Sequence, residues 1–382
     1  MSQIARVVRI GLLLHQETGY GRSILRGIIN YGKYQPSWEL IDGGPPSAAG
    51  LEDLLQAQVD AVIAEVRDPA LMELCRLKVK VLVTVASGTR PLAGSHWGGV
   101  STDNNGVGRM AFSFYHARGF RHLAFLGSPG RPYSDLRLQG FRDAATAHGL
   151  RVTLPPHAPD GTLPREELVR WLSLLPPRTA LLAANDATGV MALREIRAIG
   201  RAVPEDLVVL GVDNNELACE LTHPALSSID INTQEMGLQA SGLLKLILQE
   251  PLPENRRRLL IHPKAVVERR STDSLAVEDP RLRRALLIIR ERACEWLTVA
   301  ELLQEVHMSR RALETGFKSA FGLTLQQQID RVRVARACAL LVETRQATPD
   351  IAAACGWPSA SQMCKTFRRH TGKTPTEFRR KA

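Results

Sequence analysis

The spacing of hydrophobic positions divides the chain into two parts. Up to about residue 270, short apolar runs alternate with longer stretches in which apolar residues recur every three to four positions. The runs are typical of buried strands and the longer stretches of amphipathic helices, so this part is predicted to be an α/β domain with parallel sheets. The last hundred residues show only the helical spacing and are predicted to be all-α.

The predicted strands of the first part are seven short apolar runs: Val7–Leu14, Ala61–Ala64, Val79–Val85, His122–Gly127, Ala180–Ala183, Val208–Val212 and Ser227–Ile231. The five predicted helices are Gly21–Tyr34, Asn104–Ala117, Asp135–His148, Ala187–Ile199 and Thr233–Leu248. Because this part exceeds the usual size of one domain, we expect two similar lobes around a cleft. We expect the chain to cross between the lobes near 118–120, 228 and 255.

Two helix-turn-helix units are predicted in tandem near the C-terminus. In the first unit, a T-x-x-E capping box begins a helix at Thr298, and Ser309 caps the second helix after a short turn. This second helix is predicted to end at Gly322. A further capping box at Thr324 begins a long helix to about Glu343, which would hold the two units at a fixed separation.

The second unit repeats this plan. Thr348 is predicted to cap its first helix and Gly356 to end it, after which Ser359 caps the second helix. Ser359 stands 50 residues after Ser309, so the two units have equivalent second helices. Such helices place their N-terminal residues against base edges in the major groove of DNA.

Positive charge is concentrated in this C-terminal part. Residues 279–382 contain 19 Lys and Arg against 10 Asp and Glu, whereas residues 1–278 contain 30 against 29. Basic side chains that neutralise phosphates release counterions and bind DNA, although a basic surface also serves solubility. The predicted DNA contacts are Ser309, Arg310, Arg311, Lys318, Ser359, Ser361, Gln362, Lys365, Arg368 and Arg369.

Two runs of residues near the end of the chain resemble the AraC/XylS family of transcription regulators. They are Gly356-Trp357-Pro358-Ser359-Ala360-Ser361-Gln362-Met363-Cys364-Lys365-Thr366-Phe367-Arg368 and Gly372-Lys373-Thr374-Pro375-Thr376-Glu377-Phe378-Arg379. The resemblance covers about 280–382. Met363, Gln362 and Lys365 depart from the usual Phe, aromatic residue and Arg. The first two departures affect packing and groove contacts, and none of the three removes the fold.

The first part resembles the sugar-binding, periplasmic-protein-like domain of the LacI/GalR regulators. The matching motifs, in order, are Ser101-Thr102-Asp103-Asn104, Arg137-Leu138-Gln139-Gly140-Phe141, Ala184-Asn185-Asp186-Ala187, Val209-Leu210-Gly211-Val212-Asp213-Asn214 and Ala225-Leu226-Ser227-Ser228-Ile229 followed by Met236-Gly237. The combination of both parts resembles one small group, the regulators of xylose operons, over essentially the whole chain. The predicted divisions are a sensor at 1–270, a linker at 271–279 and a DNA-binding domain at 280–382.

Open α/β sheets bind ligands beyond the carboxyl ends of their strands, and polar residues stand at such positions here. A sugar hydroxyl both donates and accepts, so carboxylates, an amide and a guanidinium suit it. The predicted ligand contacts are Tyr20, Glu65, Arg137, Asn185, Asp186 and Asp213. Three of them have a structural alternative: an ion pair with Arg67 for Glu65, a helix cap for Asp186 and packing for Tyr20.

The resemblance implies a sugar-responsive regulator, and D-xylose is the effector that it suggests. We expect a cytoplasmic bacterial homodimer, associated with the nucleoid when bound to DNA, that activates pentose catabolism genes with RNA polymerase. A LacI-like repressor, a response to another sugar, a transport-type binding protein and a sugar-processing enzyme are the alternatives. No catalytic residue, metal or cofactor is predicted, since no Walker A, nucleophile-elbow or zinc spacing occurs.

Two further features of the sequence fit this localisation. No apolar run is long enough for a membrane span or a signal peptide. The six cysteines lack a C-x-x-C pair and disulfide-rich spacing, as expected of reduced thiols. Cys364 is expected in the core of its helix-turn-helix unit, with redox sensitivity as the alternative.

Overall fold

The computed structural model describes residues 7–86, 96–158, 160–250, 252–253, 256–273, 279–321 and 323–379. Two compact units emerge. One comprises Met1–Phe114 with Arg121–Ser274, and the other comprises Tyr115–Phe120 with Leu275–Ala382. The sequence-predicted division at 271–279 stays a prediction.

The first lobe of the larger unit is built on a six-stranded sheet. Its strand order is β11-β5-β4-β3-β1-β2, and all neighbouring strands run parallel. The strands are β1 (Val8–Leu13), β2 (Trp38–Asp42), β3 (Ala61–Ala64), β4 (Leu82–Thr84), β5 (Trp97–Thr102) and β11 (Arg258–Ile261).

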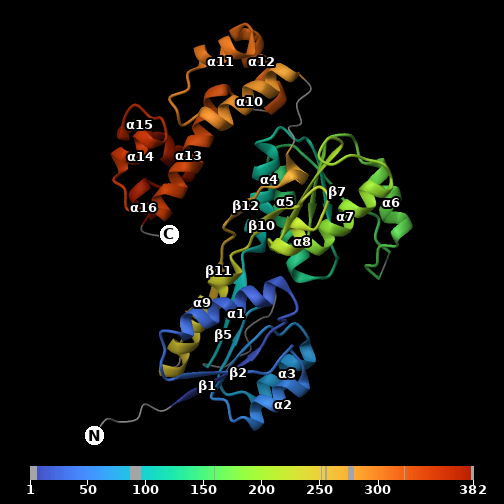
Figure 1. The fold of residues 1–382 in the computed structure, drawn as a ribbon, viewed down its shortest axis with the longest axis vertical. Coiled ribbons are helices and arrows are strands. Elements are labelled where there is room, and N and C mark those ends of the chain that lie inside the picture. The colour runs from blue at the N-terminus through green and yellow to red at the C-terminus, as the bar shows by residue number, and fades with distance from the viewer. Residues whose placement is uncertain are drawn as a thin grey trace. The chain divides into compact units, whose positions relative to one another are not determined.

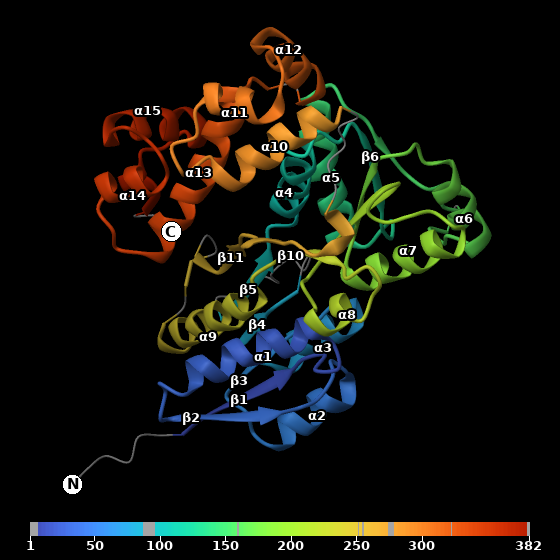
Figure 2. The same cartoon turned by 45° about the horizontal axis from the view of Figure 1, so that its top comes forward.

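Helices cover both faces of this sheet. Helices α1 (Gly19–Gly32) and α9 (Thr233–Gln249) lie side by side over one face, and α2 (Ala48–Gln56) and α3 (Pro69–Lys78) lie over the other (Figure 1 and Figure 2). The helices α1 and α9 approach so closely that a Cβ on Gly27 would lie 2.0 Å from the Gln234 carbonyl oxygen, so this position requires glycine. Side chains alternate between the faces as the pleat requires, with Ile63 packing under α1 and α9, and Val62 under α2 and α3.

The second lobe repeats this architecture. Its sheet has the order β12-β10-β9-β8-β6-β7, and only the pair of β10 with β12 is antiparallel. The strands are β6 (His122–Leu126), β7 (Val152–Thr153), β8 (Thr179–Ala183), β9 (Leu207–Val212), β10 (Ser227–Asp230) and β12 (Ala265–Val267). The helices are α4 (Asn104–His116), α5 (Pro132–Thr146), α6 (Arg165–Leu174), α7 (Asp186–Ala198) and α8 (Glu216–Glu220), and a short 3-10 helix (Arg270–Thr272) follows β12.

The predicted two-lobed α/β fold is therefore confirmed, with every predicted strand and helix of this part present. The chain crosses between the lobes after β5, after β10 and after β11. The expectation near 228 lies close to the second crossing. Those near 118–120 and 255 are wrong, because α4 already packs on α5 of the second lobe and β11 still pairs with β5 of the first.

Two of the three crossing segments are tied to each other. The Asp103 amide donates to the Ile261 carbonyl oxygen at 2.8 Å, and His262 Nδ1 lies 3.0 Å from Asp103 Oδ2. Arg109 Nη2 donates to the same carboxylate oxygen at 3.2 Å. These contacts join the segment after β5 to the segment after β11, where any change in the angle between the lobes would have to occur.

The helical unit contains α10 (Pro280–Arg292), α11 (Val299–Val306), α12 (Arg310–Phe321), α13 (Leu325–Glu343), α14 (Thr348–Ala354), α15 (Ala360–Thr371) and α16 (Pro375–Arg379). Capping boxes at Thr298 and Thr324 begin α11 and α13, as predicted. The prediction for Thr348 is wrong by one residue: Ala347 is the N-cap of α14 and makes no side-chain cap bond. Gly322, the predicted end of α12, lies outside the described residues.

Each helix-turn-helix unit has its own core. Leu313, Phe317 and Phe321 of α12 are buried with α10 and α11, whereas Met363 and Phe367 of α15 are buried with Trp357. Helix α13 contributes residues to both cores and runs between the two units (Figure 1). Among the described residues, no helix combines the length and apolar character needed to cross a membrane.

Candidate functional site

A cavity of about 490 Å³ lies between the lobes of the larger unit. It sits beyond the carboxyl ends of strands in both sheets, where open α/β folds bind ligands, and its size suits a small molecule. The first lobe lines it with Glu17, Thr18, Gly19, Tyr20 and Arg67. The second lobe lines it with Arg131, Pro132, Tyr133, Arg137, Asn185, Asp186, Ala187, Asp213 and Asn215.

Arg137 on α5 is the best-anchored cation of this cavity. It is 3 % exposed, and its guanidinium donates from Nε to Asn104 Oδ1 at 2.9 Å and from Nη2 to Asp213 Oδ1 at 3.2 Å. It also donates to the Ala184 carbonyl oxygen. A guanidinium held at several atoms keeps a fixed direction, which lets it present donors to a ligand without a further loss of side-chain entropy.

Asp213 follows β9 in an unusual backbone conformation. Its φ is +107° and that of Asn214 is +50°, a region that residues with a side chain rarely adopt. The turn is held by the Asp213 amide, which donates to the Ile229 carbonyl oxygen at 3.0 Å, and by the Asn214 amide, which donates to Ser228 Oγ at 3.0 Å. Such strain is concentrated at functional sites, and here it places a carboxylate on the cavity wall.

Burial and Arg137 act in opposite directions on the Asp213 carboxyl. Burial raises its pKa, and the nearby Arg137 guanidinium lowers it by charge and by hydrogen bonding, with a net rise above the usual value. The carboxylate therefore depends on Arg137 for its charged form.

Asn185 and Asp186 begin α7 and have different roles. Asn185 is the N-cap, accepting from the Thr188 amide at 2.8 Å, and its Nδ2 donates to the Tyr133 hydroxyl at 3.3 Å. Asp186 is 3 % exposed and accepts from Ser228 Oγ at 2.5 Å and from the Asn215 amide at 2.7 Å. The helix cap that the sequence left open for Asp186 thus belongs to Asn185.

The Asp186 carboxyl is protonated more readily than a free one. Burial first, and the Asp213 charge second, raise its pKa to about 7, against the hydrogen bonds from Ser228 and Asn215, which lower it. Near neutral pH the two carboxyls Asp186 and Asp213 therefore share one cavity wall with less than two full negative charges.

On the first lobe, Glu65 lies behind Arg67 rather than on the wall itself. The Glu65 side chain is 1 % exposed, and its Oε1 pairs with Arg67 Nη2 at 2.5 Å. Burial raises the Glu65 pKa, and the charge of Arg67 is the largest influence that opposes the rise. The ion-pair alternative for Glu65 is therefore realised. The group that lines the cavity is the Arg67 guanidinium, which Glu65 holds.

Tyr20 combines both roles considered for it. Its hydroxyl donates to the Val85 carbonyl oxygen at 3.1 Å, while its ring lines the cavity with the Arg67 guanidinium carbon 5.7 Å from the ring centroid. Sequence reasoning missed Arg67 as a wall residue, and also Tyr133, whose ring centroid is 5.3 Å from the Arg137 guanidinium carbon. Neither stands in a quoted motif, so only the three-dimensional fold identifies them.

The predicted DNA contacts in the helical unit all lie on its surface. Those from the first unit are Ser309, Arg310, Arg311 and Lys318, and those from the second are Ser359, Ser361, Gln362, Lys365, Arg368 and Arg369; all are exposed. Ser309 and Ser359 also cap their helices by accepting from the Ala312 and Gln362 amides.

Two of these basic side chains are engaged within the unit. Arg310 Nε donates to Glu314 Oε1 at 2.9 Å one turn along α12, and Arg369 Nη2 donates to Asp330 Oδ2 of α13 at 2.7 Å. The Asp330 side chain is only 8 % exposed, so the Arg369 pair fastens α15 to α13. Arg310 and Arg369 would reach phosphate only by sharing or leaving these carboxylates.

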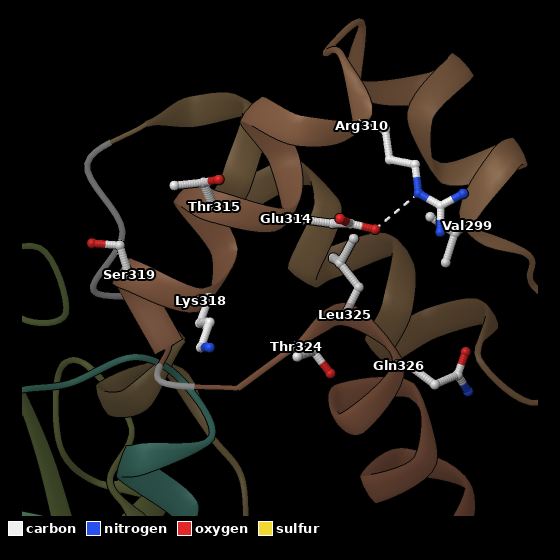
Figure 3. Close-up of a pocket in the computed structure, with 9 residues that line it drawn as sticks. All are labelled: Val299, Arg310, Glu314, Thr315, Lys318, Ser319, Thr324, Leu325 and Gln326. Carbon is white, nitrogen blue, oxygen red and sulfur yellow. Dashed lines mark hydrogen bonds and ion pairs between the residues drawn. The ribbon is translucent and has the colours of Figure 1, made fainter.

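A hollow of about 590 Å³ separates α12 from the beginning of α13 (Figure 3). Arg310, Glu314, Thr315, Lys318 and Ser319 line it from α12, and Thr324, Leu325 and Gln326 line it from the other side, with Val299 at its edge (Figure 3). Among the described residues, no cluster of His, Cys, Asp or Glu is suited to hold a metal ion.

Comparisons with known proteins agree with both halves of this description. Residues 112–272 match the family described as periplasmic binding protein-like domain, and residues 302–381 match a helix-turn-helix domain. Fold and site together define a regulatory protein in which a periplasmic-binding-type sensor is joined to a DNA-binding helix-turn-helix domain.

Relatives extend this likeness to the whole chain. The xylose operon regulatory protein of Escherichia coli (strain K12) is 31 % identical, over 97 % of this chain and 96 % of that protein. The xylose operon regulatory protein of Haemophilus influenzae is 30 % identical, over 97 % and 98 %. A solved structure of the xylose-binding transcription activator XylR covers 99 % of both chains at 29 % identity, with a TM-score of 0.62. The chain belongs to the family of xylose operon regulatory proteins.

Proposed function

We propose that this protein binds a pentose, with D-xylose as the first candidate, in the cavity between its lobes and activates transcription in response. The pair formed by Arg137 and Asp213 carries this proposal, because it places a fixed donor fork and a carboxylate on one wall of a ligand-sized cavity. The whole-length likeness to xylose operon regulatory proteins supports the choice of sugar.

The two walls supply complementary groups for a sugar ring. From the second lobe, Arg137 would donate to adjacent hydroxyls and Asp213 would accept from one. Asn185 would donate from its amide nitrogen, since its amide oxygen caps α7. From the first lobe, Arg67 would donate, positioned by Glu65, and the Tyr20 ring would lie against an apolar ring face. Asp186 would act mainly by holding the Asn215 and Ser228 segments in place.

Sugar that touches both walls would favour the closed arrangement of the lobes, because a ligand shifts a conformational equilibrium only through unequal affinity for the two states. In a homodimer, closure would change the separation of the two DNA-binding ends. We propose that this change fits both ends to their sites and allows contact with RNA polymerase, in the cytoplasm of a bacterium and at its nucleoid.

The DNA-binding end would use α12 and α15 as recognition helices. Arg311 and Gln362 are exposed near the beginnings of these helices, where side chains reach base edges, whereas Lys318, Lys365 and Arg368 lie further along and suit phosphates. We retain 1–270, 271–279 and 280–382 as the proposed sensor, linker and DNA-binding segments.

Selection of binding sites from a random duplex library tests this function without a known operator. The library would be incubated with the full chain, with and without D-xylose. We expect D-xylose to enrich a repeated pair of half-sites. An equal enrichment in both samples would contradict regulation by this sugar, and enrichment only without sugar would favour a repressor.

A thermal-shift series tests the sugar itself and the enzyme alternative. We expect D-xylose to raise the melting temperature of the wild-type chain and to be recovered unchanged. The Arg137→Ala variant should lose the rise, and Arg142→Ala, an exposed arginine on the same helix, should keep it. Turnover of the sugar would overturn the assignment as a regulator without enzymatic activity.

A further inference from the structure

Two cysteines from different helix-turn-helix units meet in the helical unit. Cys294 follows α10 in the first unit, and Cys355 ends α14 in the second, at the C-cap. Their thiols influence each other directly, since each shifts the pKa of the other. The backbones are also close, since a Cβ built on Gly356 would lie 2.9 Å from the Cys294 carbonyl oxygen.

This contact belongs to a packed part of the unit rather than to its edge. Cys355 is buried in the core of the second unit with Trp357, and Cys294 is half-buried against the same core. Arg333 of α13 donates from Nε to the Ala293 carbonyl oxygen at 2.8 Å, which fixes the segment that carries Cys294. The ends of α10 and α14, together with α13, therefore hold the two cysteines close to each other.

The surroundings also divide the two thiols into a reactive one and a protonated one. The hydrogen bond from Cys355, and then the charges of Arg333 and Arg336, lower the pKa of Cys294 to about 7 against the effect of burial. The same hydrogen bond and burial raise the pKa of Cys355. A thiolate that is partly exposed beside cations is the form that reacts with oxidants.

We propose that Cys294 and Cys355 form a reversible disulfide when the protein meets a hydroperoxide, and that this bond joins the two helix-turn-helix units across α13. The proposal concerns the helical unit alone and does not depend on which sugar the sensor binds. Regulatory disulfides in reducing compartments are typically transient bonds of this kind.

The reaction balances in two steps. The Cys294 thiolate attacks one peroxide oxygen, a sulfur–oxygen bond forms, the oxygen–oxygen bond breaks, and the leaving oxygen departs as water or an alcohol after taking a proton. Cys355 then attacks the Cys294 sulfur, the sulfur–sulfur bond forms, and hydroxide leaves and takes the Cys355 proton as water. The two thiols lose two electrons, and the hydroperoxide gains them.

Three other cysteines are poorly placed for this reaction. Burial raises the pKa of Cys75 to about 11 and that of Cys338 to about 11, and burial is also the largest cause that raises the pKa of Cys219 to about 12. Their thiolate fractions near neutral pH are therefore small, so peroxide should oxidise Cys294 in preference to these three cysteines.

Mass spectrometry of the oxidised full chain tests the site. The reduced protein would be treated with a small excess of hydrogen peroxide, its remaining thiols blocked with N-ethylmaleimide, and the products digested without reductant. We expect one main cross-linked peptide that joins Cys294 to Cys355, and its loss after dithiothreitol. Over-oxidation of Cys294 without a cross-link, a bond between chains, or no reaction would each overturn the proposal.

Two variants separate this bond from general oxidation. In Cys355→Ser, peroxide should leave Cys294 as a sulfenic acid, which a dimedone probe labels; in Cys364→Ser the cross-link should form as in the wild type. In the full wild-type chain, oxidation should raise the urea concentration at which the helical unit unfolds, because a cross-link restricts the unfolded chain. In Cys355→Ser, oxidation should not raise it. A cross-link that appears only after urea is added would show that the native sulfurs do not meet.

Discussion

The Arg137 guanidinium donates to the Asp213 carboxylate across 3.2 Å and thereby joins α5 to the strained turn after β9. Both side chains line the cavity between the lobes, and Arg137 also holds Asn104 at the beginning of α4. One arginine thus connects the wall of the ligand cavity to a helix that directly follows a crossing between the lobes.

Replacing this arginine should affect both stability and ligand binding. In Arg137→Ala, Asp213, whose side chain is 24 % exposed, loses its counter-charge, which should reduce the free energy of unfolding by about 3 kcal/mol. Urea denaturation at pH 7 measures this change. Arg142→Ala should remain within about 0.5 kcal/mol of the wild type, since Arg142 is exposed on the same helix; equal losses in both variants would contradict the role of the pair.

The raised pKa of Asp186 should make the stability of the protein depend on pH. Its pKa is raised in the folded state from 3.8 to about 7, so the folded chain binds more protons than the unfolded chain between these values. Its contribution to stability is therefore full below about pH 4 and is lost as the pH rises through about 7, at no more than about 1.4 kcal/mol per pH unit.

Urea midpoints between pH 4.5 and 7.5 test this expectation. Asp186→Asn should flatten the fall of stability with rising pH, and Asp143→Asn, an exposed aspartate on α5, should leave it as in the wild type. A slope that is the same in all three proteins would show that another group governs the pH dependence.

Ser359 should contribute stability as the cap of α15. Its side chain accepts from the Gln362 amide at 3.2 Å, and Ser359→Ala would leave this amide without its side-chain acceptor. We expect a loss of about 1 kcal/mol in urea denaturation. Ser361→Ala, two residues further on and exposed, should cost much less; an equal cost would mean that the cap is not stabilising.

Lys365 and Arg369 lie on the same helix but should respond differently to substitution. Lys365→Ala should weaken binding to random-sequence duplex DNA and reduce the slope of log affinity against log salt by about 0.9, if one phosphate contact is lost. Arg369→Ala should in addition destabilise the unit by about 1 to 3 kcal/mol, because the nearly buried Asp330 loses the cation paired with it and keeps the hydrogen bond from Gln326.

Fluorescence anisotropy over a series of salt concentrations, together with urea denaturation, separates these effects. If Lys365→Ala lowered stability and Arg369→Ala did not, the ion pair would not have the structural role assigned to it.

Local signals explain what the sequence predicted well. The caps at Thr298, Thr324 and Ser359 depend on neighbours three residues away, so the helices they begin were predictable from short windows. The prediction failed at Thr348 because the preceding Ala347 occupies the cap position without a polar side chain, which leaves no residue signal.

Strands β5 and β11 of the structure were not predicted, because local signals are absent there. Strand β5 begins with Trp97, Gly98 and Gly99, and β11 begins at Arg258 after two other arginines, so neither resembles a buried apolar run. They form because β4 and β5, and then β5 and β11, pair over long separations in the chain. Such pairing is decided by the tertiary fold rather than by intrinsic propensity.

The cavity wall shows the same limit. Arg137 and Asp213 stand in recognisable motifs, whereas Arg67 is brought over Tyr20 by the folding of the first lobe alone. Glu65 was expected on the wall because it directly follows β3, yet its side chain is turned into the lobe and holds Arg67. Position in the sequence predicts that these residues lie near the cavity, and the packing of the lobe decides which of them line it.

Isothermal titration calorimetry of the full chain with D-xylose, L-arabinose and D-ribose tests the central claim most directly. We expect saturable binding of D-xylose at one site per chain, weaker or no binding of the other two pentoses, and loss of binding in Arg137→Ala but not in Arg142→Ala. No heat from any pentose, or D-xylose binding that is unchanged by Arg137→Ala, would contradict a pentose site built on Arg137 and Asp213.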